Sequence, residues 1–236
     1  MSAGDWPRRL PDNGVVDASG FWKLLGEADQ AILTAASRLR VFASGTVLCG
    51  EGEPTTHVFI VLSGWVKVIT VTREGREMLE ALRGEGDVIG DIAGTITGYR
   101  TASIQAIGPV RTLIAGARQF EDFLDTHPNA ARAYRRAMAE RQQVAFESQR
   151  SQVLHSGVQR LARLLLDLTE PGEEPGRSAA TTPMPLSQEE LASLIGASRS
   201  TVTRALREWR LRRVIRTGQR RITILDRPQL LRLAGR

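Results

Sequence analysis

Residues 187–212, SQEELASLIGASRSTVTRALREWRLR, contain the pattern that decides how the C-terminal part of the chain folds. Ser187 can cap a first helix that begins at the next residue, because its side-chain oxygen and the two following acids face unpaired N–H groups. Gly196 accepts the positive φ that ends this helix, and Ser198 caps a second helix that reaches about Trp209. Two short helices joined by a glycine-containing turn predict a helix-turn-helix.

The second of these helices is expected to have one buried face and one basic face. Val202, Leu206 and Trp209 recur at helical spacing and are predicted to point inward. The opposite face carries arginines and hydroxyl groups, which suit a recognition helix in the major groove of DNA. The residues expected to contact DNA are Ser187, Gln188, Ser198, Arg199, Ser200, Thr201, Thr203, Arg204 and Arg207, with Arg220 and Arg221 from the segment that follows.

That following segment, residues 214–225 with the sequence VIRTGQRRITIL, predicts a hairpin. Two β-rich runs flank a Thr-Gly-Gln turn, and the tip is basic through Arg216, Arg220 and Arg221. A basic hairpin beside a helix-turn-helix predicts a winged helix that binds double-stranded DNA. The alternative is a structural helical hairpin with a solvated basic face, because arginine is also a good helix former.

Charge is divided unevenly along the 236 residues, whose net charge is +6. Residues 186–236 contain 12 arginines against four acids, whereas the remainder has 20 basic against 22 acidic residues. A chain of this length accommodates two modest domains. A basic C-terminal domain on a nearly neutral body is expected where one part meets phosphate and the other has a different task.

Cysteine and histidine usage argues against metal and redox chemistry. The single cysteine, Cys49, cannot form an internal disulfide or a four-thiolate cluster, and it is expected to be buried in a strand. His57, His127 and His155 show no ligand spacing with it, so no metal cofactor is expected. No Walker loop, HExxH, GxSxG or acid–base pair indicates an enzyme.

The N-terminal flank supplies no targeting signal. No charged-then-apolar leader opens the chain, and no window approaches 18 uninterrupted apolar residues, so a cytoplasmic protein without a membrane span is expected. Residues 1–20 are predicted to form a loose arm. Residues 27–39 show helical spacing of their apolar positions and predict a helix, with the buried face Ala28, Ile32, Ala35 and Leu39.

From residue 41 to 115 the pattern changes to short β-rich runs separated by glycines such as Gly45, Gly64 and Gly86. Runs of this length with turn signals between them predict an antiparallel sandwich or barrel, of which a β-roll is the simplest form. A β domain with a filled core and no ligand remains the alternative.

Residues 117–168 return to helical patterns. A short helix is predicted up to His127-Pro128, and a long one from about Asn129 to Leu154 without glycine or proline. The apolar face of the long helix is expected to pair with a second copy of the chain, although Arg141 and Ser148 interrupt it. Further amphipathic helices are predicted around residues 158–168 and 226–234, with a Pro/Gly-rich flap at 171–183.

Several stretches carry a resemblance to a known family: EGEPTTHVFIVLSGWVKV, GEGDVIGDI, YRTAS and LSQEELASLIGASRSTVTRAL. Over about residues 27–225 the chain resembles the cyclic-AMP receptor protein and fumarate-nitrate regulator (Crp/Fnr) family of bacterial transcription regulators. The resemblance implies a homodimer joined along the long helix, an effector bound in the β-roll, and a pseudo-palindromic DNA site. RNA polymerase is the protein partner that it implies.

The resemblance also implies an effector site. Gly90-Asp91 and Arg100-Thr101-Ala102 match the family's phosphate cassette, in which helical-turn N–H groups and an arginine share one anion. The effector residues expected are Gly90, Asp91, Ile92, Arg100, Thr101 and Phe146. The resemblance implies that the effector is a cyclic nucleotide. Removal of the Arg100 side chain is expected to cost an anion partner but no core packing.

Three departures from the family pattern bear on specificity. Asp91 is one methylene shorter than the family's glutamate, and Ala145 and Phe146 stand where the cyclic-AMP receptor presents threonine and serine to adenine. In the recognition helix, Ser200 replaces a glutamate between Arg199 and Arg204. A vestigial or differently occupied pocket, with Arg100 as a structural ion-pair partner, therefore remains open.

The predicted fold class is α+β, with an N-terminal cyclic-nucleotide-binding-type β-roll, a long dimerisation helix and a C-terminal winged helix-turn-helix. The predicted organisation is an arm at residues 1–20, an effector domain at 21–128, a dimerisation helix and hinge at 129–155 and a DNA-binding domain at 156–236. The predicted function is an effector-responsive DNA-binding regulator. The alternative is a regulatory domain that acts on a protein partner, or a DNA binder that needs no ligand.

Overall fold

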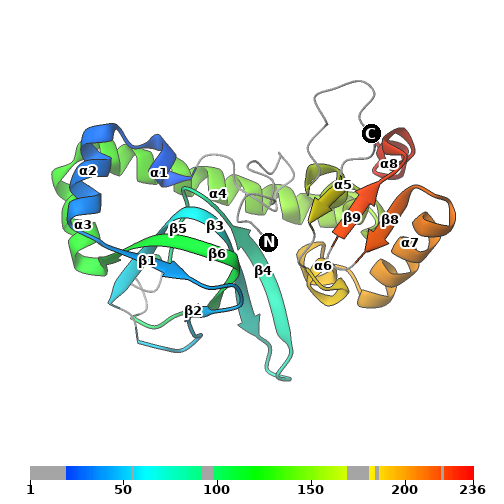
Figure 1. The fold of residues 1–236 in the computed structure, drawn as a ribbon, viewed down its shortest axis with the longest axis horizontal. Coiled ribbons are helices and arrows are strands. Elements are labelled where there is room, and N and C mark those ends of the chain that lie inside the picture. The colour runs from blue at the N-terminus through cyan, green and yellow to red at the C-terminus, as the bar shows by residue number, and fades with distance from the viewer. Residues whose placement is uncertain (1–19, 55, 92–97, 169–180, 184–185, 219–220) are drawn as a thin grey trace. The chain divides into compact units, whose positions relative to one another are not determined.

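The structure is a computed structural model that describes residues 20–54, 56–91, 98–168, 181–183, 186–218 and 221–236. These residues divide into two compact units, one within residues 19–143 and the other within residues 144–236 (Figure 1). The fold is mixed helix and sheet, as predicted. No helix in the described ranges is both long and apolar enough to span a membrane.

The N-terminal unit is built on one antiparallel sheet. Its strands follow the order β1-β6-β3-β4, with β2 paired to β6 and β5 paired to β3. The strands are β1 (Arg38–Phe42), β2 (Val47–Cys49), β3 (His57–Val71), β4 (Glu77–Arg83), β5 (Val88–Ile89) and β6 (Ser103–Gly116). The predicted β-rich region is therefore confirmed. Gly64, however, lies at a bulge inside the continuous strand β3 rather than between two strands.

Strand β3 contributes to two hydrophobic cores because alternate side chains point to opposite faces. Val58 and Ile60 join one core, whereas Phe59 and Val61 join the other. The first core contains residues from four helices that pack on the sheet, and the second fills the interior of the roll. The helices are α1 (Phe21–Leu24), α2 (Glu27–Ala35), α3 (Ala117–Thr126) and α4 (Pro128–Leu154).

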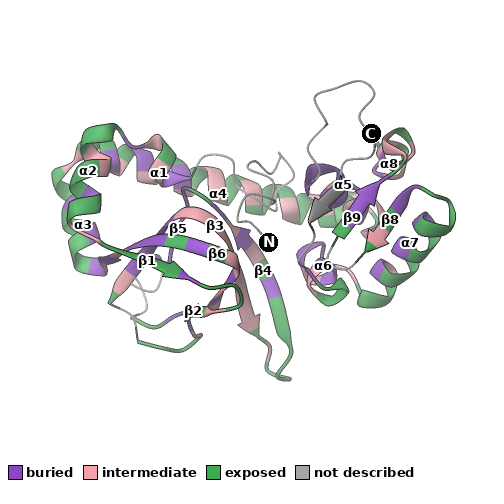
Figure 2. Cartoon of the chain, in the orientation of Figure 1, coloured by how far each residue is buried: buried purple, intermediate pink, exposed green. Residues whose placement is uncertain are grey.

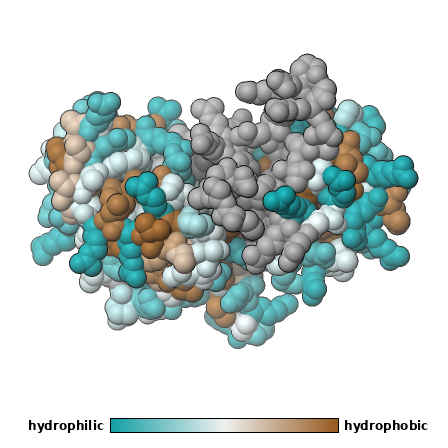
Figure 3. Space-filling model, in the orientation of Figure 1, coloured by the Kyte–Doolittle hydropathy of each residue, from teal (hydrophilic) through white to brown (hydrophobic). Residues whose placement is uncertain are grey.

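The predicted helix over residues 27–39 is wrong in its end and in its buried face. Helix α2 stops at Ala35, and Leu39 lies in β1, paired with Leu113 of β6. Leu33 is the buried residue of α2, whereas Ile32 is 45% and Leu39 is 52% exposed. The sheet overrides the local helical pattern here, because pairing with β6 satisfies the backbone from Arg38 onward. Figure 3 shows hydrophobic atoms gathered at the surface in the region of β1.

The two helices after the sheet lie as the sequence predicts. Helix α3 ends at Thr126 and α4 runs from Pro128 to Leu154. Ala130, Ala133 and Ala137 are the buried residues of α4, and their small side chains let the helix approach the first core closely. Arg141 does not interrupt an outer face of α4, because its side chain bonds to Asp91 within the N-terminal unit.

The C-terminal unit contains the predicted helix-turn-helix and hairpin. Its elements are α5 (Gly157–Leu168), β7 (Thr181–Pro183), α6 (Gln188–Leu194), α7 (Arg199–Leu211), β8 (Ile215–Gly218), β9 (Arg221–Ile224) and α8 (Arg227–Leu233). Strands β8 and β9 form the hairpin, and β7 adds a third strand against β9. The predicted flap is therefore wrong for residues 181–183. Figure 2 shows that buried and exposed residues alternate along α7, as an amphipathic helix requires.

Asp167 on α5 is a buried carboxylate in this unit. Its Oδ1 accepts a hydrogen bond from Arg236 at 3.3 Å, whereas no described residue donates to its Oδ2. Burial outweighs the effect of Arg236 and raises the pKa of Asp167 from 3.8 to about 7. Because the folded pKa is the higher one, the resulting stabilisation is complete below about pH 4 and is lost as the pH rises through about 7.

We therefore expect Asp167→Asn to stabilise the C-terminal unit at pH 8 and to remove its dependence on pH between 5 and 8. The gain at pH 8 should be at most about 4 kcal/mol, at about 1.4 kcal/mol for each pKa unit. Protection factors of the α5 and α8 amides across this pH range measure it. Glu208→Gln removes an exposed carboxylate from the same unit and is the control. A parent and an Asp167→Asn protein with the same pH dependence would contradict the prediction.

Candidate DNA-binding and effector sites

The start of α6 is fixed by a reciprocal cap. The Ser187 hydroxyl accepts from the Glu190 N–H at 3.1 Å, and the Glu190 carboxylate accepts from the Ser187 N–H at 2.6 Å. These two bonds satisfy N–H groups that the helix itself leaves unpaired. Ser187 therefore has a structural task in addition to its predicted contact with DNA.

The turn between α6 and α7 depends on a glycine. Gly196 has a φ of +58°, a conformation that side chains with a Cβ rarely adopt. Ser198 then caps α7, because its hydroxyl accepts from the Thr201 N–H at 3.1 Å. The cap brings the exposed Arg199 and Ser200 to the first turn of α7, where a recognition helix points at base edges.

Helix α7 has one buried apolar face, and Leu211 at its C-terminal end is its one exposed large apolar residue. Val202, Ala205, Leu206 and Trp209 are buried, as three of them were predicted to be. The predicted DNA-contacting residues on α7 that are exposed are Arg199, Ser200, Thr203, Arg204 and Arg207, and Thr201 is half-buried.

Some of these polar groups already have partners within the protein. Thr203 donates to the Gln188 side-chain oxygen at 2.6 Å, and Arg199 lies 3.7 Å from Glu189 in an exposed ion pair. Exposed pairs of this kind are weak and give way to a phosphate or base with little loss.

Two of the three arginines predicted at the tip of the hairpin lie on its strands. Arg216 on β8 and Arg221 on β9 are both exposed. Arg220 lies outside the described residues, so the structure does not place it. The Thr217 hydroxyl accepts from Arg210 of α7 at 3.4 Å, which links the hairpin to the helix.

In the N-terminal unit, the predicted phosphate residues surround a cavity of about 110 Å³. Gly90, Asp91, Arg100 and Thr101 all line it, and Ile92 lies outside the described residues. Phe146 belongs to the C-terminal unit and is 60% exposed. Further lining residues are Val68, Arg83, Ile89, Ala102, Ile104 and Arg141.

Arg100 is a buried cation, only 3% exposed. Its guanidinium donates to the carbonyls of Gly90 at 3.1 Å and His57 at 2.9 Å, and it lies 5.4 Å from the Phe59 ring centroid. A Cβ on Gly90 would lie 1.9 Å from Arg100 Nη1, so this approach requires glycine. Arg100 is thus built into the core, and the expectation that its removal costs no packing is wrong.

The charge of Arg100 has no carboxylate within ion-pair distance in the described part of the chain. The structure therefore gives no support to Arg100 as a structural ion-pair partner. Burial first and the charge of Arg100 second lower the pKa of His57, whereas the charge of Glu53 opposes this shift. Buried charges are normally paired, so this cavity is suited to an anion.

Asp91 accepts hydrogen bonds from two side chains that the sequence analysis did not identify as its partners. Its Oδ2 accepts from the Tyr134 hydroxyl at 3.0 Å and from Arg141 Nη2 at 2.5 Å. Burial and the Asp91 charge raise the pKa of Tyr134, which stays protonated. In the sequence, Arg141 interrupts the apolar face of the long helix. That interruption was the signal that could have predicted an arginine facing inward.

Cys49 is buried beside this site. Burial raises the pKa of its thiol despite the opposing charge of Arg100, so the thiol is protonated at neutral pH. No three His, Cys, Asp or Glu side chains in the described ranges are grouped to hold a metal ion.

Comparisons with known proteins match both domains. Residues 39–127 match the cyclic nucleotide-binding domain, and residues 159–233 match the Crp-like helix-turn-helix domain. The CRP-like cAMP-activated global transcriptional regulator of Mycobacterium tuberculosis is 30% identical over 221 residues, which cover 93% of this chain and 98% of that protein. The global nitrogen regulator of Nostoc sp. is 29% identical over 79% of this chain and 84% of its own.

Solved structures show the same fold. The c-di-GMP-responsive regulator CLP of Xanthomonas campestris matches with a TM-score of 0.73 at 19% identity, over 85% of this chain and 99% of that one. A CRP/FNR-family regulator from Thermus thermophilus matches with a TM-score of 0.66 at 25% identity, over 84% and 99%.

These matches identify the two domains as those of an effector-responsive DNA-binding regulator, and they do not favour the alternative of a domain that acts on a protein partner. The relatives are transcription regulators, which are not enzymes. The chain belongs to the Crp/Fnr family of bacterial transcription regulators.

Proposed function

We propose that this regulator binds a twofold DNA site as a homodimer when a cyclic nucleotide occupies the cavity around Arg100. The observation that carries the proposal is the buried guanidinium of Arg100, whose charge no described carboxylate pairs. A cyclic phosphate supplies the missing anion, and the guanidinium binds it by charge-assisted hydrogen bonds.

The chemistry of the cavity bears on which nucleotide binds. A relative is named as cAMP-activated and a structural neighbour as c-di-GMP-responsive, so both ligands are candidates. Because Asp91 is held by Tyr134 and Arg141, a ribose hydroxyl must compete with Arg141 for that carboxylate. We propose that Thr101, Gly90 and Ile92 complete the phosphate site, and that Phe146 stacks on the base.

The division of tasks along the chain follows from these sites. We propose an arm at 1–20, an effector domain at 21–128, a dimerisation helix and hinge at 129–155 and a DNA-binding domain at 156–236. On DNA, the regulator contacts RNA polymerase and works in the cytoplasm. No catalytic step and no metal are part of this proposal.

The first prediction concerns dimerisation through α4. Val153 and Leu154 are 85% and 59% exposed, and Phe146 lies seven residues before Val153, so one side of α4 carries exposed apolar residues at heptad spacing. Because the Arg141 side chain bonds to Asp91 within the N-terminal unit, we expect it to weaken this seam less than the sequence suggested. Light scattering at micromolar concentration should show a dimer, and Val153→Glu should shift it toward monomer. Val47→Glu, which places the same charge on an exposed residue of β2, is the matched control, and a monomeric parent with and without nucleotide would contradict the prediction.

The second prediction concerns the effector. Arg100→Gln should weaken binding of the active nucleotide by roughly 1.5 to 3 kcal/mol, because it removes a charge-assisted contact. It should also lower the stability of the free protein, since two carbonyls lose a donor. Calorimetry against cyclic mono- and dinucleotides, at a temperature where both proteins are folded, separates these effects. Arg73→Gln removes the same charge from an exposed turn and should bind as the parent does. Equal affinities of parent and Arg100→Gln for every nucleotide would overturn the phosphate role.

The third prediction concerns base readout. Arg199 and Arg204 can each bind guanine O6 and N7 as a fork, whereas Ser200 has one short hydroxyl and cannot act as a carboxylate acceptor. We expect half-sites with guanine preferences opposite both arginines and a relaxed base pair between them. Arg199→Ala or Arg204→Ala should cost about 1 to 3 kcal/mol and relax one position.

Selection from a random duplex library, repeated with each variant, measures this readout. Arg220→Ala and Arg221→Ala should each weaken binding to all sequences alike, because arginines of the wing contact phosphate. Arg212, which pairs with Glu208 at the far end of α7, is the control position. The assignment fails if no twofold motif is recovered or if Arg221→Ala changes a single base preference.

A further inference from the structure

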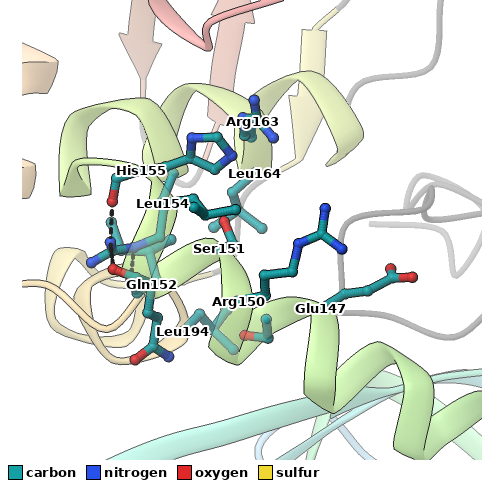
Figure 4. A pocket seen from close by; sticks show the side chains of 12 residues that line it. Glu147, Arg150, Ser151, Gln152, Leu154, His155, Arg163, Leu164 and Leu194 are labelled. Atoms are coloured by element: carbon teal, nitrogen blue, oxygen red, sulfur yellow. Dashed lines mark hydrogen bonds between the residues drawn. The ribbon is translucent and has the colours of Figure 1, made fainter.

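Arg160, in the first turn of α5, donates to four backbone carbonyls. Its Nε bonds to Ile195 O at 2.6 Å and its Nη2 to Gly196 O at 2.8 Å. Its Nη1 bonds to Gln152 O at 3.1 Å and to His155 O at 2.5 Å. Figure 4 shows Gln152 and His155 at this joint, with dashed lines for hydrogen bonds.

The four carbonyls come from the C-terminal ends of two different helices. Gln152 and His155 lie at the end of α4, and Ile195 and Gly196 lie at the end of α6. The last carbonyls of a helix have no partner within it, and they form the negative end of its dipole. A guanidinium is planar, always charged and rich in donors, so one arginine can serve both ends at once.

The start of α5 packs closely against the turn of the helix-turn-helix. A Cβ on Gly157 would lie 3.0 Å from Ala197 Cβ and 3.3 Å from Thr201 Cγ2. A Cβ on Gly196 would lie 2.9 Å from the Gln152 side chain. The start of α5 is therefore in close contact with the turn of the helix-turn-helix and with the first turn of α7.

We propose that Arg160 is a positioning residue for DNA binding, which sets the turn of the helix-turn-helix, and with it the start of α7, against the end of α4. The proposal rests on the proposed DNA binding by α7. Arg160 bonds to the carbonyls of Ile195 and Gly196 in the turn, and Gly196 lies two residues before the cap Ser198. It orients Arg199 and Arg204 without contacting DNA itself.

A matched control stands one turn further along the same helix. Arg163 Nε donates to Ala234 O at 2.8 Å, so this arginine fastens α8 rather than the helix-turn-helix. Arg163 lines the hollow of about 230 Å³ beside the joint, together with Leu154 and Leu164 (Figure 4). Removing it takes the same charge and a comparable carbonyl contact from α5.

The experiment compares full-length parent, Arg160→Gln, Arg160→Lys and Arg163→Gln on the duplex that the parent selects from a random library. Affinity is measured over a series of salt concentrations, at a temperature where amide exchange shows every protein folded. We expect Arg160→Gln to bind about tenfold or more weakly, with unchanged base preferences and an unchanged salt slope. Arg160→Lys should fall between it and the parent, and Arg163→Gln should bind within about twofold of the parent. Exchange in peptides spanning residues 192–201 should be faster only in the Arg160 variants.

Each other outcome overturns the inference in a recognisable way. A salt slope smaller by about 1, or the loss of one base preference, would show that Arg160 contacts DNA itself. An equal loss of DNA affinity in Arg163→Gln would show that the effect comes from general destabilisation of α5. Parent-like affinity in both Arg160 variants would refute the positioning role while DNA binding stands. A parent that selects no duplex would refute the proposed function itself.

Discussion

Backbone carbonyls that their own strand or helix leaves unpaired must find a donor, and a guanidinium meets this need in both units. Arg100 binds the carbonyls of His57 and Gly90, which are far from it in sequence. Arg160 does the same for the ends of α4 and α6. A buried carbonyl without a partner costs about 1 to 3 kcal/mol. Arg100 meets two part-buried carbonyls, and Arg160 meets two part-buried and two exposed ones, so each arginine holds several chain segments in one arrangement. The functional elements of each unit are built around that arrangement.

The two arginines differ in how their charge is balanced. The positive charge of Arg160 faces the negative ends of two helix dipoles, so the protein itself supplies the compensation. Arg100 faces neutral carbonyls and the Phe59 ring, and the nearby Asp91 is held by Arg141 and Tyr134. The charges of Glu53 and Asp91 favour the charged form of Arg100 only from beyond ion-pair distance. A buried cation whose hydrogen bonds all go to neutral groups favours an anionic ligand, whereas one that faces helix ends favours a rigid joint. The same side chain thus suits a binding site in one unit and a structural joint in the other.

Strand β3 links the core of the N-terminal unit to its cavity. Its alternating side chains belong to two cores, so a one-residue slip would exchange the residues that face each core. The carbonyl of His57 and the ring of Phe59 contact Arg100, so the register that fills the cores also positions Arg100 in its cavity. The packing of the sheet and the position of the guanidinium are therefore coupled.

Local signals in the sequence determined most of the architecture and the basic face of α7. Caps such as Ser187 and Ser198, the positive φ of Gly196 and the helical spacing of Val202, Leu206 and Trp209 act within a few residues, so they can be read from the sequence directly. The β runs separated by glycines and the uninterrupted long helix could also be predicted from the sequence. The resemblance to a family indicated Arg100 as the residue expected to bind an anion.

Tertiary structure alone decided the features that depend on contacts between distant residues. Leu39 follows a helical pattern but pairs in β1, because the ladder with β6 outweighs its local preference. Arg141 turns inward to a carboxylate 50 residues away, and residues 181–183 become a strand because β9 presents an edge to them. The partners of Arg160 come from two helices that the sequence separates by about 40 residues. No periodicity encodes such a contact, since it depends on how elements pack once they have formed.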